Sequence, residues 1–394
     1  MINPFSYSHP ADPKYFVNRE NHLEFFIKAI KNSAKIKPYS PENFIILGDW
    51  GYGKTSLLRK MEEIVLKELT PEIKVFSFYF TLTPEICKSW DTFCFSFLTE
   101  LKDKHKFSSG ISIIKSKIQD KVLKWKISSI SVGFNPSVSI KKEENKEGNI
   151  SLEDNLEDLW KKHLEPSGID ICVLFLDDIQ YFLQERQSNP FFTIRNTFQE
   201  LARRECNFSL VMTGPKTLFE NADMVDPFRR FFRQFYLEPL TIEATKDAIN
   251  KRIEIQKLNL EFSDDVILEI YKKSDGHPYY IMVIAYEIVN LIGDKGKLTK
   301  EDFNNLWLKI IPILEEDMAS RLVGVSEKEK ECLIKMSLID NSVSPSMLKE
   351  IKGSTTILSR LEEKRLIVKR ERGKYEVFHP LFKEYLRKLK QTQV

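Results

Sequence analysis

The fold of this chain is decided by the stretch Gly48-Asp49-Trp50-Gly51-Tyr52-Gly53-Lys54-Thr55-Ser56. It fits the pattern GxxxxGK[ST], and it lies between an apolar run and a helical pattern. Glycines let the backbone turn tightly so that successive N–H groups point at phosphate oxygens, and a helix start adds its positive end. The stretch is therefore predicted to bind the phosphates of ATP, with Lys54 on the β- and γ-phosphates and Thr55 on Mg²⁺.

Apolar runs on both sides of this loop indicate a parallel sheet. Strands are expected at 44–47, 75–80, 171–176 and 208–213, with helical patterns between them and a further strand-like run at 235–240. Strands that alternate with helices form α/β folds in which helices cover both faces of a parallel sheet. After Leu240 we expect the strands to stop, and helices at 242–256, 264–273, 278–292 and 300–316 to form a helical lid domain.

The length of 394 residues predicts two or three domains. We expect an ATPase core at 1–240 with an insertion at about 105–165, which includes a hairpin at 127–140. A helical lid follows at 241–320. In the last part, 326–394, three helices (326–338, 344–351, 355–364) precede a hairpin, which is the pattern of a winged helix.

The strand expected at 171–176 ends in two carboxylates, Asp177 and Asp178. Ligands of open parallel sheets bind at the carboxyl ends of the strands. Asp177 is predicted to hold Mg²⁺ through water, and Asp178 to position or polarise the attacking water. Thr213, at the end of the next strand, is a candidate contact for the γ-phosphate or that water, and a plain exit from the strand is the less favoured alternative.

Three arginines, Arg229, Arg230 and Arg233, cluster before the last strand-like run. An arginine that reaches the nucleotide of a neighbouring copy stabilises transition-state charge, which would require a homo-oligomer. A surface helix with phenylalanines inward and arginines outward explains the same pattern. Both interpretations stay open.

The segment Ser274–Tyr280 opens the predicted third lid helix. Pro278 suits the first turn of a helix. Gly276 would let the backbone approach the base or ribose of a nucleotide. His277 between them is more often a packed or capping residue than a ligand.

The charge of the chain is uneven. Residues 326–394 carry 16 Lys and Arg against 10 Asp and Glu, whereas the other residues carry 44 against 47. A basic C-terminal module points to nucleic acid, but a solvated surface explains it as well. Double-stranded DNA is expected to bind through its phosphates. The candidate contacts on the third helix and the hairpin are Arg360, Lys364, Lys369, Arg370, Arg372 and Lys374.

Other classes of protein are disfavoured by the composition. No apolar run reaches the roughly 18 residues of a membrane span, and the first residues lack a signal-peptide pattern. The five cysteines are scattered, without a CxxC pair, which predicts a reducing cytoplasm and no structural zinc.

Taken together, the phosphate loop, the strand that ends at Asp177-Asp178, Thr213, and the Gly276–Pro278 turn resemble the archaeal ATPase family, within the AAA+/STAND region of P-loop proteins. The domain order is similar to that of archaeal origin-recognition initiators. Residues 15–20 resemble the family's N-terminal box beside the adenine, which implies Phe16 and Arg19 as nucleotide contacts. Two departures are Asn18, where the family usually has Gly, and Asp178, where many AAA+ enzymes have Glu.

The resemblance implies ATP or ADP with Mg²⁺ as cofactors and leaves three functions open. The first is an ATPase whose nucleotide state controls DNA binding or assembly. The second is a STAND-like switch whose winged helix docks protein. The third is a scaffold that binds nucleotide without turning it over.

Overall fold

The computed structural model describes residues 3–69, 72–103, 151–184, 189–219, 225–293, 296–371 and 373–392. They form two compact units: residues 10–238, and residues 239–394 together with the first nine residues. The change of unit lies two residues from the boundary expected at 240. Nothing in the sequence pattern indicated that the first nine residues would pack with the second unit.

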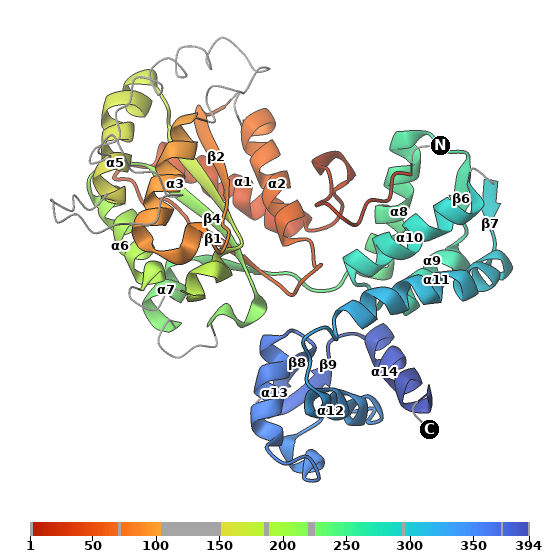
Figure 1. Ribbon diagram of the computed structural model, residues 1–394. Coiled ribbons are helices and arrows are strands. Elements are labelled where there is room, and N and C mark those ends of the chain that lie inside the picture. Colours follow the sequence, from red (N-terminus) through yellow and green to blue (C-terminus); the bar gives the residue numbers. More distant parts are fainter. Residues whose placement is uncertain are drawn as a thin grey trace. The chain divides into compact units, whose positions relative to one another are not determined.

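The first unit is built on a five-stranded parallel sheet with the order β2-β3-β4-β1-β5 (Figure 1). This confirms the α/β fold and the parallel pairing that the sequence predicts. The strand β5 begins two residues before the strand-like run at 235–240. The strands are β1 (Phe44–Leu47), β2 (Val75–Thr81), β3 (Ile171–Asp177), β4 (Phe208–Gly214) and β5 (Arg233–Tyr236).

Helices cover both faces of this sheet (Figure 1). Along β3, the side chains of Ile171, Val173 and Phe175 enter one core cluster, while the alternate residues enter the other. A strand that is buried on both faces reads as an unbroken apolar run, as here. The first cluster holds α1 (Glu20–Lys35) and α2 (Lys54–Ile64); the second holds α3 (Trp90–Asp103), α5 (Leu152–Leu159), α6 (Pro190–Arg203) and α7 (Val225–Phe231).

The insertion expected at 105–165 extends too far at its C-terminal end. Ser151 caps α5, since its Oγ accepts a hydrogen bond of 3.1 Å from the Asp154 N–H. Trp160 and Leu164, in the π-helical turn that follows, are completely buried in the second core cluster. Residues 152–164 are therefore part of the core. The hairpin expected at 127–140 lies outside the described residues.

The second unit contains the four helices expected after Leu240. The prediction that strands stop there is wrong, because Leu260–Phe262 (β6) and Gly296–Leu298 (β7) pair in parallel. Strands of three residues are too short for an alternating pattern to reveal them. The helices are α8 (Ile242–Gln256), α9 (Asp264–Ser274), α10 (Pro278–Ile292) and α11 (Lys300–Ser320).

The first residues of the chain pack against these helices. Phe5 is completely buried beside Phe262, at 6.2 Å between ring centroids. Tyr7 meets Tyr279 and Tyr286 edge to face.

The last part of the second unit combines helices with an antiparallel pair of strands. The predicted helix at 344–351 is only a 3₁₀ turn, Pro345–Leu348. A C-terminal helix, α14 (Pro380–Thr392), was not predicted, and it buries Leu381, Phe382 and Leu386. The other elements are α12 (Glu327–Ser337), α13 (Ser354–Glu363), β8 (Ile367–Glu371) and β9 (Lys374–Val377). Across the described ranges, no helix has the length and apolar character that a membrane crossing requires.

Candidate functional site

The phosphate loop leaves β1 at the carboxyl edge of the sheet and runs directly into α2. Gly51 and Gly53 have φ of +79° and +86°, a left-handed conformation that glycine adopts without a steric penalty. Gly53 is the N-cap of α2, and no described side chain caps that helix start. A helix start without a side-chain cap presents backbone N–H groups and a positive dipole end, which suits a phosphate.

Neighbouring contacts fix the position of this loop. The Gly48 N–H donates to the Gly214 carbonyl of β4 at 3.3 Å. The Lys54 ammonium donates to the carbonyls of Gly48 and Asp49, both at 2.9 Å. Ser56 accepts a hydrogen bond from the Ala11 N–H at 3.0 Å, so its hydroxyl also holds the segment before α1. Lys54 and its neighbour Thr55 thus stand at the helix start, where an anion would bind.

Thr213 connects the two aspartates at the end of β3. Its hydroxyl donates to Asp177 Oδ1 and accepts from the Asp178 N–H at 2.9 Å. Asp178 has φ of +65°, and its Oδ1 accepts from Gln180 Nε2 at 2.8 Å. Because Thr213 is completely buried and its proton is used on Asp177, the geometry supports a positioning role. The predicted contact of Thr213 with the γ-phosphate or the attacking water stays a prediction.

Tyr79 is a site residue that the sequence analysis missed. Its hydroxyl donates to Asp177 Oδ2 at 2.7 Å. Burial, and then the Asp177 carboxylate, raise the pKa of Tyr79, which keeps the phenol a neutral donor. The contact depends on the register of β2 on β3, which places Thr81 opposite Asp177 and Tyr79 opposite Phe175. The alternation of each strand was visible, but not which strand it would pair with.

The donors fit a magnesium ion that arrives with a nucleotide. Asp177 continues the alternation of Ile171, Val173 and Phe175, so it lies on the face of the sheet that α2 covers. Among the described residues no group of three or more His, Cys, Asp or Glu side chains could hold a metal ion. Mg²⁺ is commonly held by one or two carboxylates together with waters and substrate phosphates. Asp177 supplies such a carboxylate, and the Thr55 hydroxyl at the start of α2 is a second oxygen donor.

The predicted arginines lie at the opposite edge of the sheet. Arg233 is the first residue of β5 and pairs with Phe44, the first residue of β1, whereas the phosphate loop follows the last residue of β1. Three residues of strand span about 10 Å. Arg229 and Arg230 precede β5 in α7 and are exposed. These arginines are therefore remote from the phosphate loop of their own chain.

The N-terminal box explains one departure from the family pattern. Asn18 has φ of +64° and Arg19 of +72°. Asn tolerates this left-handed conformation better than most residues, so it can replace the usual glycine. The Arg19 guanidinium donates to the Glu238 carbonyl, and burial lowers its pKa. Phe16 packs against the core cluster of α1 and α2.

Gly276 and Pro278 lie in the second unit. Pro278 is at the first turn of α10, as the sequence predicts. Gly276 has φ of +67°, and a Cβ there would lie 2.3 Å from the Leu240 carbonyl oxygen. The close approach that requires glycine is thus to the chain's own backbone. Contacts of either residue with a nucleotide stay a prediction.

The candidate DNA contacts are largely paired with acidic side chains. Lys364 binds Glu329, which is buried, at 2.7 Å and lowers the pKa of Glu329 to about 2. Arg370 pairs with Glu376 at 2.9 Å, and Lys374 with Glu371 at 2.7 Å. Arg360 is exposed on α13, and Lys369 is half-buried in β8. Arg372 lies outside the described residues.

Comparison with known proteins supports the resemblance that the sequence indicated. Residues 19–211, a little under half of the chain, match the KAP family P-loop domain. The match includes the phosphate loop, Asp177 and Asp178, and it ends inside β4. No curated protein matches this chain.

Solved structures share the fold over nearly the whole chain. The Walker-type ATPase of Pyrococcus abyssi is 15% identical with a TM-score of 0.55, over 95% of this chain and 99% of that one. The ORC2 protein of Aeropyrum pernix, solved as ADPNP–ADP complexes, is 12% identical with a TM-score of 0.58, over 99% and 98%. The ORC1 protein of the same organism, in complex with DNA, is 14% identical with a TM-score of 0.50, over 96% and 95%. At these identities the likeness shows the fold alone.

Proposed function

We propose that this chain is an AAA+ ATPase that binds ATP with Mg²⁺ at residues 48–56 and hydrolyses it slowly. One observation supports it above the others: the phosphate loop and the Asp177–Thr213–Asp178 group end neighbouring parallel strands at one edge of the sheet. An anion-binding helix start beside a buried, hydrogen-bonded carboxylate is the arrangement that a metal–triphosphate pair requires.

Each residue of the group would contribute one function. Lys54 exchanges its two carbonyl acceptors for phosphate oxygens, and Thr55 with Asp177 holds the metal ion, which neutralises charge on the phosphates. Asp178 positions the attacking water, and the bond from its N–H to Thr213 fixes its backbone. An Asp side chain is one methylene shorter than Glu, so we expect slower turnover than in enzymes with Glu at this position.

The second unit would convert the nucleotide state into control of DNA. In this proposal α8–α11 form a lid, in which Gly276 and Pro278 border the nucleotide. Residues 326–392 form a winged helix, with α13 and the β8–β9 hairpin facing duplex DNA. In support, the chain shares its fold with the ORC1 protein of Aeropyrum pernix, which was solved in complex with DNA. Arg229, Arg230 or Arg233 would complete the site of a neighbouring copy, because they lie too far from their own.

A STAND-like switch, in which the winged helix docks protein, is the second candidate. The buried His379 favours it: its Nδ1 accepts from the Leu381 N–H at 3.1 Å, so Nε2 donates to the Ser274 carbonyl at 2.8 Å. Burial lowers the pKa of His379 to about 4, which keeps the ring neutral in this arrangement. The residue before α14 is thereby hydrogen-bonded to the end of α9, as expected of a module that docks internally.

The experiment that separates these functions is a titration of duplex DNA at two salt concentrations, with ATP and with ADP, beside a measurement of ATP turnover. The DNA-controlling ATPase predicts turnover and salt-sensitive binding that differs between the nucleotides. No duplex binding at low salt with either nucleotide, together with tightly retained ADP, would instead establish the switch. Nucleotide binding without measurable turnover would establish the scaffold.

A further inference from the structure

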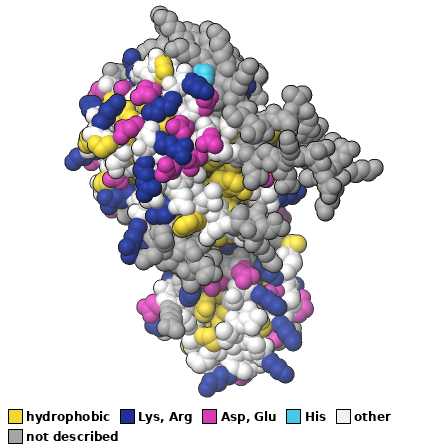
Figure 2. All heavy atoms as spheres, turned by 90° about the vertical axis from the view of Figure 1, so that its left-hand side faces the viewer, with side chains coloured by type: hydrophobic (Ala, Val, Ile, Leu, Met, Phe, Trp, Pro, Cys, Tyr) yellow, Lys and Arg dark blue, Asp and Glu magenta, His cyan; other side chains and the backbone are white. Residues whose placement is uncertain are grey.

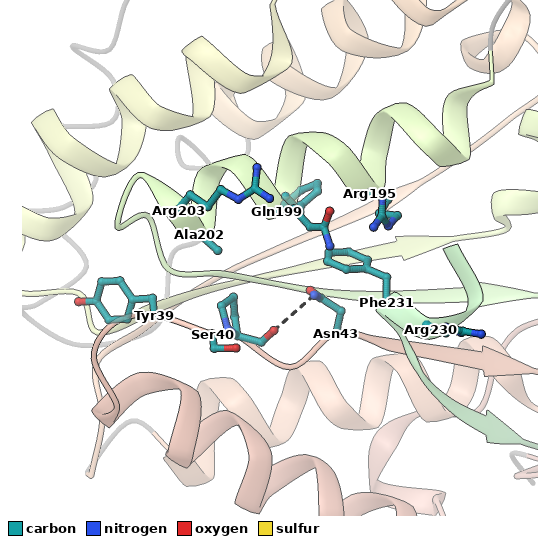
Figure 3. Close-up of a pocket in the computed structure, with 11 residues that line it drawn as sticks. Tyr39, Ser40, Asn43, Arg195, Gln199, Ala202, Arg203, Arg230 and Phe231 are labelled. Carbon is teal, nitrogen blue, oxygen red and sulfur yellow. Dashed lines mark hydrogen bonds between the residues drawn. The ribbon is translucent and has the colours of Figure 1, made fainter. Parts of the chain in front are cut away.

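A pocket of about 670 Å³ opens at the amino edge of the central sheet, on the opposite side from the phosphate loop (Figure 3). One wall is α6, and the other is the segment before β1, with Tyr39, Ser40 and Asn43. Arg230 and Phe231, from the end of α7, complete the lining. Pockets of this volume accommodate small organic ligands.

Cationic side chains line α6 along one face. Arg195, Gln199 and Arg203 are four residues apart, so they lie on successive turns of the same face. The two arginines are therefore separated by about 12 Å along the helix axis. The buried Nε of Arg195 donates to no described acceptor, and its Nη1 donates to Asn196 at 3.1 Å. Together with Arg230, three guanidinium groups contribute to the lining.

The charge of the pocket differs from that of the surface around it. Lys and Arg side chains are interspersed with Asp and Glu around α5 and α6 (Figure 2). None of the eleven described residues that line the pocket is acidic; Glu200, which lies outside the lining, pairs with Arg203 at 3.3 Å. Guanidinium groups bind phosphate and carboxylate groups through pairs of charge-assisted hydrogen bonds. The pocket is thus suited to an anion.

Aromatic and amide groups narrow the class of anion. The rings of Tyr39 and Phe231 are half-buried, so each keeps some exposed surface. Gln199 contributes an amide that can pair with the edge of a base. Asn43, in contrast, is used by the wall itself: it accepts from the Leu210 N–H and donates to the Pro41 carbonyl. Proteins commonly bind nucleotides and single-stranded nucleic acids by contacting the phosphates with arginines and stacking the bases on aromatic rings.

We propose that this pocket binds a nucleotide unit at a second site, separate from the phosphate loop, with phosphate on the arginines and the base on Tyr39 or Phe231. The unit comes either from a free nucleotide or from a single-stranded nucleic acid. The roughly 12 Å between Arg195 and Arg203 would let more than one phosphate bind.

The test uses the full chain with Lys54→Ala, which removes the phosphate loop as a competing site. Binding of AMP and of a labelled oligothymidylate of about ten nucleotides is measured by calorimetry and by fluorescence anisotropy. The variants are Arg195→Gln with Arg203→Gln and, as a control of equal charge change, Lys28→Gln with Lys88→Gln. Both control lysines are exposed, and neither lines the pocket. Circular dichroism checks that all variants fold.

We expect replacement of both arginines to weaken probe binding at least about tenfold, because charge-assisted hydrogen bonds are lost. Replacement of both lysines should leave probe binding as in the parent. Loss of AMP binding alone identifies a free nucleotide, and loss of oligothymidylate binding alone identifies a single strand. The proposal is overturned if the arginine and lysine substitutions weaken probe binding equally, or if the Lys54→Ala chain binds neither probe. Unchanged probe binding after replacement of both arginines overturns it as well, because the arginines would then not hold the ligand.

Discussion

Charged residues cluster both at the carboxyl edge of the central sheet and on the β8–β9 hairpin, but the two clusters are organised differently. At the sheet edge, Asp177 is buried, and it accepts hydrogen bonds from Thr213 and Tyr79. On the hairpin, Arg370 and Lys374 are exposed and pair with acids of the same hairpin.

The difference shows what each cluster is built to do. Buried groups that converge from separate strands fix a geometry, because the core holds every partner in place. Exposed ion pairs contribute little and exchange partners readily. Charged residues that cluster in a sequence therefore indicate a functional site more reliably when they follow buried strands than when they lie in a hairpin.

The largest effect should come from Lys54→Ala. The variant loses the ammonium that would contact the β- and γ-phosphates, so ATP should bind at least about 100-fold more weakly. Lys60→Ala, in the same helix and paired with Glu63, is the matched control and should bind as the parent does. Calorimetric titration with ATP measures both. Parental affinity in Lys54→Ala would show that the loop is not the nucleotide site.

Asp178→Asn should keep ATP binding and slow turnover by roughly a hundredfold, because the metal ligand Asp177 remains while the water loses its acceptor. The control is Asp170→Asn, at the other end of β3, where the carboxylate accepts from the Lys74 N–H at 2.7 Å. Steady-state phosphate release checks the pair. Equal rates in parent and Asp178→Asn would remove Asp178 from the mechanism.

Tyr79→Phe tests whether the hydrogen bond from Tyr79 helps to position the Asp177 carboxylate. Loss of one hydrogen bond to a carboxylate should raise the Mg²⁺ concentration for half-maximal turnover by roughly tenfold, and change the maximal rate less. Tyr236→Phe, an exposed tyrosine of β5, serves as the control. A lower Mg²⁺ requirement in Tyr79→Phe would mean that the phenol competes with the metal.

Lys364→Met and Arg360→Ala test which cation at the C-terminal end of α13 stabilises the fold. Removing Lys364 leaves Glu329 buried with only its Ser326 contacts, which should cost about 2 kcal/mol of unfolding free energy. Arg360→Ala should change stability by less than about 0.5 kcal/mol. Urea unfolding measures both. Because its folded pKa lies near 2, the contribution of Glu329 should persist above about pH 4.3 and disappear as the pH falls towards 2.

The smallest effect is expected on the hairpin. If Arg370, Arg372 and Lys374 each contact a phosphate, replacing all three by Ala should reduce the slope of log affinity against log salt concentration by roughly three units. Since two of them are paired with glutamates, we expect about one to two units. Measuring affinity across a salt series decides this. A slope equal to that of the parent would exclude the hairpin from DNA.

The sequence by itself determined the sheet and the loop. Four strands lie within one residue of their predicted ends, since each is a largely apolar run that a polar residue or a glycine ends or follows. The starts of α2 and α10 were also predictable from local sequence. Gly53 adopts the left-handed conformation before α2, and Pro278 fits the first turn of α10.

Only the tertiary structure decided which groups meet. The contact of Tyr79 with Asp177 depends on the register of two strands about 100 residues apart, which no local pattern encodes. The pairing of Lys364 with Glu329, and the packing of Phe5 on the second unit, likewise join distant segments. A sequence specifies periodicity and turns locally, but the partner of each buried polar group is chosen when the core closes around it.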